Sequence, residues 1–131
     1  MDQARLKDVP FFSALSPQDS AAVAQHIDEV SVAAGSVLAR EGDLGDKFFV
    51  IESGTAEVTR GGAPVAKLGA GDFFGEIALI REEHRVATVT ATSPMALMVM
   101  KGSSFRSLDS SIPELRETVS KALAERRAPV V

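Results

Sequence analysis

The chain has 131 residues, of which 45% are hydrophobic and 24% are charged, and its formal net charge is −4. This length and balance are typical of one globular domain with one buried core, and the acidic charge argues against nucleic-acid binding as the main role, because phosphate contact needs a basic face. The sequence has no cysteine, which excludes disulfides, thiol catalysis and thiolate metal sites.

The first predicted element is a short helix over the stretch SPQDSAAVAQHI, which begins after Ser16. Ser16 suits the N-cap position and Pro17 suits the first helical position. Asp19 falls in the first turn, where acidic side chains are favoured. We therefore expect a helical N-terminus over residues 1–28.

From residue 29 onward, short β-branched runs alternate with Gly, Asp and Pro. A spacing of roughly 8–12 residues between such runs is typical of an all-β sandwich or barrel. The polar and apolar alternation in TAEVTR and RVATVTAT is typical of half-buried strands. We count seven or eight strands over residues 29–101. The predicted fold class is mainly β, an eight-stranded jelly-roll β-barrel with flanking helices.

After Gly102 the apolar spacing becomes helical again. Ser111 and Glu114 form a capping-box pattern, which predicts a helix start at Ser111. The stripe that follows consists of Ile112, Leu115, Val119, Ala122 and Leu123. Arg126 and Arg127 lie near the end, where cations are favoured. We predict C-terminal helices over residues 102–127 and a single domain over residues 1–131.

The densest group of candidate functional residues lies in GDFFGEIALIREEHRVAT, residues 71–88. Gly75 and Glu76 precede the apolar run IALI, which fits either a short strand or one or two helical turns. A helix start there would offer N–H groups to an anion, and Arg85 follows at the head of the next strand. The Glu76 carboxylate needs a donor such as a sugar hydroxyl. Amides and an arginine for phosphate, with a carboxylate for a hydroxyl, indicate a nucleotide.

The stretch FGEIALIREEHRVAT resembles the phosphate-binding cassette of the cyclic nucleotide-binding domains. That family includes regulatory subunits of protein kinase A, bacterial catabolite activator proteins and nucleotide-gated channels. Its pattern, F-G-E-(L/I)-A-L and then R-x-A-(T/S), fits without a gap. EGDLGDKFFVIESGTAEV resembles the early strands of the family, and FRSLDSSIPELRETVSKAL resembles its C-terminal helices. The resemblance therefore covers nearly the whole chain.

The resemblance implies a sensor that binds cyclic AMP (cAMP) and is not an enzyme. Because the sequence has no signal-peptide region and no apolar run of membrane-span length, we expect a cytoplasmic location. The resemblance also implies that Glu76 accepts from the ribose 2′-hydroxyl and that Arg85 pairs with the cyclic phosphate. Val86 stands where members that favour cyclic GMP (cGMP) often carry Thr, which implies a preference for cAMP. The implied ligand-binding residues are Gly75, Glu76, Ile77, Ala78, Arg85, Val86 and Ala87, with Val58 and Val65 lining the base pocket.

By the same resemblance, the last helix covers the bound base as a lid. The lid candidates are Leu115, Val119, Leu123, Arg126 and Arg127. The alternative interpretation is that this stripe belongs permanently to the core. We expect an effector domain or partner protein that receives the signal, with homodimer formation as one option. We expect no nucleic-acid partner, no membrane partner, no metal and no resident cofactor.

Simpler interpretations stand beside these hypotheses. Taken alone, Arg85 fits a solvated surface charge, and Glu76 fits a helix N-terminal acid. Asp43 and Asp46 fit a turn, and the paired phenylalanines fit the core. The rival functions are an interaction module that has lost ligand binding, and an enzyme. The regulated output stays open between a channel, a kinase, an acetyltransferase, a transcription factor and a complete small protein.

Overall fold

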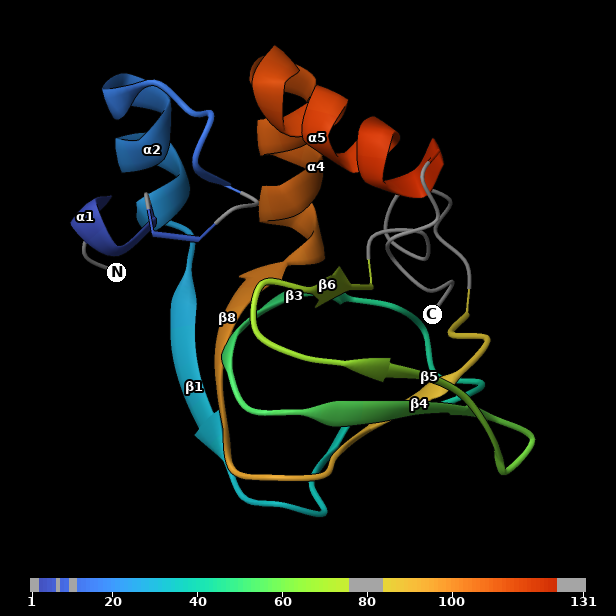
Figure 1. Cartoon of the computed structure of the whole chain (residues 1–131). Coiled ribbons are helices and arrows are strands. Elements are labelled where there is room, and N and C mark those ends of the chain that lie inside the picture. The colour runs from blue at the N-terminus through green and yellow to red at the C-terminus, as the bar shows by residue number, and fades with distance from the viewer. Residues whose placement is uncertain (1–2, 7, 10–11, 76–83, 125–131) are drawn as a thin grey trace.

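The computed structural model describes residues 3–6, 8–9, 12–75 and 84–124. The helices are α1 (Gln3–Leu6), α2 (Pro17–Ala24), α4 (Gly102–Ser111) and α5 (Pro113–Ala124). The strands are β1 (Asp28–Val32), β2 (Val37–Ala39), β3 (Lys47–Ser53), β4 (Ala56–Arg60), β5 (Ala63–Leu68), β6 (Phe73–Phe74), β7 (Thr88–Ala91) and β8 (Met95–Lys101). Figure 1 shows α4 and α5 above one end of the strands, with α1 and α2 beside α4.

The strands form two antiparallel sheets of four strands each, in the orders β1-β8-β3-β6 and β2-β7-β4-β5. The prediction of a mainly β, eight-stranded jelly roll is confirmed. Within the described ranges the two sheets pack as a sandwich and do not close into one barrel. The edge strands β2 and β6 have only three and two residues, which is too short to carry pairing from one sheet round to the other.

Strands β3 and β8 are buried on both faces, which explains why their sequences read as continuous apolar runs. Successive side chains of a strand point to opposite faces. In β3, Phe48 and Val50 pack under the helices, whereas Phe49 and Ile51 face the interior of the sandwich. The sheet that contains β3 therefore separates two hydrophobic clusters, a helical one and an interior one.

The helical cluster joins both ends of the chain to this sheet. Phe105 of α4 stacks on Phe48 of β3, with 4.8 Å between the ring centroids. Leu115 of α5 is 1% exposed and belongs to the same cluster. At the other end of the chain, the Asp19 N–H donates to Ser16 Oγ over 3.1 Å. The predicted N-cap of α2 is therefore confirmed.

The predicted N-cap at Ser111 is wrong. Ser111 is the last residue of α4, and its hydroxyl donates to the Ser107 carbonyl one turn earlier in that helix. Pro113, which suits a first helical turn, begins α5. The capping-box pattern was misleading because a serine hydroxyl also bonds to the preceding turn at a helix end.

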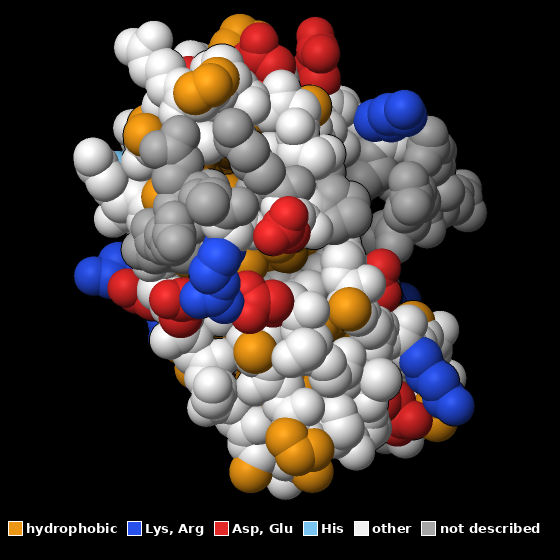
Figure 2. Space-filling model, turned by 60° about the vertical axis from the view of Figure 1, so that its left-hand side comes forward, with side chains coloured by type: hydrophobic (Ala, Val, Ile, Leu, Met, Phe, Trp, Pro, Cys, Tyr) orange, Lys and Arg blue, Asp and Glu red, His pale blue; other side chains and the backbone are white. Residues whose placement is uncertain are grey.

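Arg5 of α1 ties the N-terminal helices to the edge of the first sheet. Its guanidinium forms ion pairs with Glu29 of β1 and Glu52 of β3. The hydrogen bond to Glu52 is the main cause that raises the pKa of the Arg5 guanidinium. On the face shown in Figure 2, basic and acidic side chains lie side by side in one group. No helix in the described part of the chain combines the length and apolar character needed to cross a membrane.

Candidate functional site

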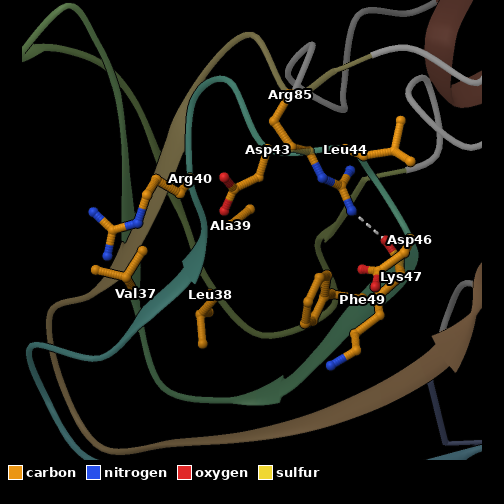
Figure 3. Close-up of a pocket in the computed structure, with 10 residues that line it drawn as sticks. All are labelled: Val37, Leu38, Ala39, Arg40, Asp43, Leu44, Asp46, Lys47, Phe49 and Arg85. Carbon is orange, nitrogen blue, oxygen red and sulfur yellow. Dashed lines mark hydrogen bonds between the residues drawn. The ribbon is translucent and has the colours of Figure 1, made fainter.

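A cavity of about 390 Å³ lies at the end of the sandwich where β2 and β3 approach the start of β7. It is lined by β2, the loop that follows β2, the first residues of β3, and Arg85. This volume falls in the range of small-molecule sites. Figure 3 shows the Arg85 side chain reaching across the cavity toward Asp46 and Lys47, with Phe49 on the opposite wall.

Backbone hydrogen bonds hold Arg85 against the β2–β3 loop. The Arg85 N–H donates to the Asp43 carbonyl over 2.7 Å, and the Arg85 carbonyl accepts from the Gly42 N–H over 2.9 Å. A β-bridge between Leu44 and His84 continues this pairing. The β2–β3 loop and the segment before β7 are therefore joined by backbone pairing, although they lie about forty residues apart in the sequence.

The Arg85 side chain is buried, with 5% of its surface exposed. Its Nη1 donates to the Gly75 carbonyl over 2.9 Å, and its Nη2 donates to the Lys47 carbonyl. These two bonds fix the direction of the guanidinium plane. A planar, fixed guanidinium at a cavity wall is suited to hold an anion such as phosphate.

Gly75 is the second predicted site residue that the structure brings to this position. Its φ is +96°, a backbone conformation that favours glycine. Its backbone passes so close to Arg85 and Lys47 that a side chain would collide with them. The glycine therefore allows the main chain to approach the guanidinium and to accept its hydrogen bond.

The charged side chains around the cavity do not all face Arg85. Figure 3 shows Asp43 to one side of the guanidinium and Asp46 beneath it, whereas Arg40 points away from it. The Lys47 side chain also runs away from Arg85, although its carbonyl holds the guanidinium. Arg40, Lys47 and Arg85 all line the cavity, and Arg85 is the one of these three cations that is buried.

The remaining predicted binding residues lie in different surroundings. Val58 and Ala87 are fully buried in the interior cluster of the sandwich. Val65 and Val86 are 52% and 41% exposed. Of the predicted set, the structure therefore brings Gly75 and Arg85 into direct contact and leaves these four outside that contact.

Several predictions fall outside the described residues. The cassette helix and its residues Glu76, Ile77 and Ala78 lie in the range 76–83. The lid candidates Arg126 and Arg127 lie in the range 125–131. Val119 and Leu123 belong to α5, but their side chains are not described, and Leu115 lies in the helical cluster. The roles of all these residues stay predictions.

Sequence reasoning missed most of the cavity wall. Phe49 belongs to the core, as expected, and Asp43 and Asp46 lie in the connection between β2 and β3. The sequence did not show that all three also line the cavity with Lys47. The stretch EGDLGDKFF lies far from Arg85 in the sequence, and no local pattern reports their pairing. The sequence feature that could have indicated this wall is the spacing of glycines and acids in EGDLGD, the loop between β2 and β3. Elsewhere in the described ranges, no three His, Cys, Asp or Glu residues gather closely enough to hold a metal ion.

The chain matches the family model of the cyclic nucleotide-binding domain over residues 29–111. It is 40% identical over 119 residues to a cyclic nucleotide-gated potassium channel of Rhizobium etli, covering 91% of this chain and 33% of the channel. It is 36% identical over 110 residues to a cAMP-dependent protein kinase regulatory subunit of Aspergillus niger, covering 82% of this chain and 27% of that subunit.

A solved structure agrees with these matches. The regulatory domain of Toxoplasma gondii PKA, crystallised with cAMP, superposes with a TM-score of 0.81 at 32% identity and covers 94% of this chain and 48% of that chain. The chain thus spans about a third or less of the two curated relatives and about half of the solved chain. With its jelly-roll sheets and its buried arginine beside a glycine carbonyl, the chain belongs to the family of cyclic nucleotide-binding domains.

Proposed function

We propose that this chain is the ligand-sensing domain of a regulatory protein, that it binds cAMP in preference to cGMP, and that it binds without catalysing a reaction. The observation that carries the proposal is Arg85. Its buried guanidinium lines the cavity, and hydrogen bonds to the carbonyls of Gly75 and Lys47 fix its orientation there. Membership of the cyclic nucleotide-binding family supports the proposal that the anion held by Arg85 is the cyclic phosphate of the nucleotide.

The proposed roles follow the cassette residues. Arg85 pairs with the cyclic phosphate, and Glu76 accepts from the ribose 2′-hydroxyl. Backbone amides near Ala78 and Val86 add hydrogen bonds to the phosphate, with Gly75, Ile77 and Ala87 completing the cassette. Val58 and Val65 are the proposed contacts of the base. The proposal requires no resident cofactor and no metal.

The proposed base preference rests on Val86, which follows the cassette arginine directly and is 41% exposed. Valine has no hydroxyl to accept from the guanine amino group. A donor buried without a partner destabilises a complex by roughly 1–3 kcal/mol. Adenine has no amino group at that position, so cAMP avoids this penalty.

The proposed switch is α5, acting as a lid over the base. Ligand shifts the population toward the docked helix only to the extent that it makes more favourable contacts there. Leu115 anchors the start of α5 in the helical cluster, so the segment free to act as a lid is the later part of the helix, with Val119, Leu123, Arg126 and Arg127. The signal would pass to an effector domain or partner protein, and homodimer formation stays a prediction.

Calorimetric titration of the wild-type chain with cAMP, cGMP and 5′-AMP tests the proposal. We expect the order cAMP, then cGMP, with 5′-AMP weakest, because only the cyclic phosphate fits the cassette. Analysis of the cAMP after the titration should find no 5′-AMP. A folded chain that binds neither cyclic nucleotide would instead be a non-binding interaction module, and hydrolysis of cAMP would make it an enzyme.

A further inference from the structure

A second cavity, of about 580 Å³, lies where the β2–β3 loop meets the end of β8 and the start of α4. It is lined by Leu44, Asp46 and Lys47 on one side and by Lys101 and Arg106 on the other. We call it the basic groove, because three of these five side chains are cationic and one is acidic. The whole chain carries a net charge of −4, so this concentration of positive charge opposes the overall balance.

The two lysines of the basic groove are direct neighbours across the sheet. Lys47 of β3 and Lys101 of β8 are antiparallel register partners. Directly opposite side chains lie on the same face, and like charges at such positions are destabilising. The other sheet pairs opposite charges at the comparable position, because Lys67 of β5 lies opposite Glu57 of β4. The lysine pair therefore lacks the cross-strand compensation that the chain provides elsewhere.

Among the described residues, the cations of the basic groove also have no acidic partner in an ion pair. Within the described ranges, no ion pair engages the side chain of Lys47, Lys101 or Arg106. Their ammonium and guanidinium groups are exposed to solvent. Figure 3 shows that the Lys47 side chain runs away from Arg85. Lys47 lines both the cavity beside Arg85 and the basic groove.

We propose that the basic groove binds an acidic segment of a partner protein, with carboxylates on the three cations and an apolar side chain against Leu44. Leu44 is 60% exposed, which leaves an apolar wall beside the cations. A bare phosphate would not use that wall. An extended nucleic acid would be repelled by the acidic remainder of the surface. A short peptide that combines glutamates with a leucine fits both features.

Fluorescence anisotropy with the full chain tests this proposal. The probe is a labelled peptide of alternating Glu and Leu, and the control peptide carries Gln in place of Glu. At low salt we expect binding of the acidic peptide and little of the control, with the difference shrinking as salt screens the charges. The double variant Lys101→Glu/Arg106→Glu should weaken binding of the acidic peptide by about tenfold or more.

The matched control is Arg60→Glu/Lys67→Glu, which changes the net charge equally on exposed positions of β4 and β5. It should retain the wild-type affinity within about twofold. Circular dichroism verifies that each variant folds. If Lys101→Glu/Arg106→Glu misfolds, Lys101→Gln/Arg106→Gln replaces it in the test, because it removes the two cations without adding acids.

Three results would overturn the proposal. Equal losses in the groove variant and the matched control would show a response to net charge alone. Loss of binding in Arg85→Leu without loss in the groove variant would place the peptide in the nucleotide cavity. Tighter binding of tripolyphosphate or of single-stranded DNA with the same number of charges would make the groove a phosphate site. None of these readouts depends on cAMP binding.

Discussion

Gly75 and Arg85 fit together with no room for a side chain between them. A Cβ at position 75 would lie 2.8 Å from Arg85 Nη1 and 2.8 Å from the Lys47 carbonyl oxygen. Both distances are shorter than carbon atoms normally approach nitrogen or oxygen. The glycine of the cassette is thus a requirement of the arginine as well as of the backbone.

Gly75→Ala should therefore lower both stability and cAMP affinity. Alanine at positive φ and the collision with Arg85 together destabilise the fold by roughly 1–3 kcal/mol. The matched control is Gly35→Ala, because Gly35 has a φ of +91° but nothing within 4 Å of an added Cβ. Denaturant unfolding should show a loss in both variants, and calorimetry should show an affinity loss in Gly75→Ala alone. Equal affinity in the two variants would contradict the contact with Arg85.

Arg85→Leu should reduce cAMP affinity about tenfold to a hundredfold, the equivalent of a charge-assisted bond of roughly 1.5–3 kcal/mol. The substitution should also lower stability, because it leaves the carbonyls of Gly75 and Lys47 without this donor.

Denaturant unfolding of Arg85→Leu should therefore also show a loss of roughly 1–3 kcal/mol. Arg85→Lys should recover little affinity, since an ammonium lacks the planar fork. Arg40→Leu is the control, because Arg40 borders the same cavity and points away from Arg85. Unchanged cAMP affinity in folded Arg85→Leu would remove Arg85 from the site.

Val86→Thr should narrow the difference between cAMP and cGMP affinity by roughly tenfold, because the new hydroxyl can accept from the guanine amino group. Val86 is exposed, so the substitution should leave stability nearly unchanged. Competition titrations with both nucleotides measure the ratio. A wild-type chain that prefers cGMP would show that the base is recognised elsewhere.

Lys101→Glu should raise the free energy of unfolding by about 0.2–1 kcal/mol, because it places an acid opposite Lys47 in the sheet. The effect should lie at the low end and shrink in salt, since both side chains are exposed. Lys67→Glu is the matched control of opposite sign, because it places a second acid opposite Glu57. If Lys101→Glu were destabilising, the two lysine charges would not repel each other appreciably.

Amide exchange of α5 should become slower when cAMP binds if the helix acts as a lid. The gain in amide protection should be largest near the C-terminal end of α5. It should be small near Leu115, which is already buried. Mass spectrometry of exchange over residues 113–124, with and without saturating cAMP, measures this. Identical protection with ligand bound would assign the helix permanently to the core.

The parts of this fold that the sequence predicted depend on neighbours in the chain. The cap at Ser16 and the alternation of β4 and β7 are set within a few residues, and both were found. The helix boundary at Ser111 was misplaced because the same hydroxyl suits either end of a helix. The cavity wall was largely missed because Asp43 and Arg85 meet through long-range backbone pairing.

The two apolar faces of β3 have a consequence for how this domain can change during evolution. Phe48 touches the helices, and the next residue, Phe49, borders the cavity beside Arg85. Inserting or deleting one residue within β3 would exchange these faces and send each side chain into the wrong cluster. Surface loops such as the turn at Gly61 and Gly62 can lengthen without that exchange. Related chains should therefore vary in loop length while the length of β3 stays constant.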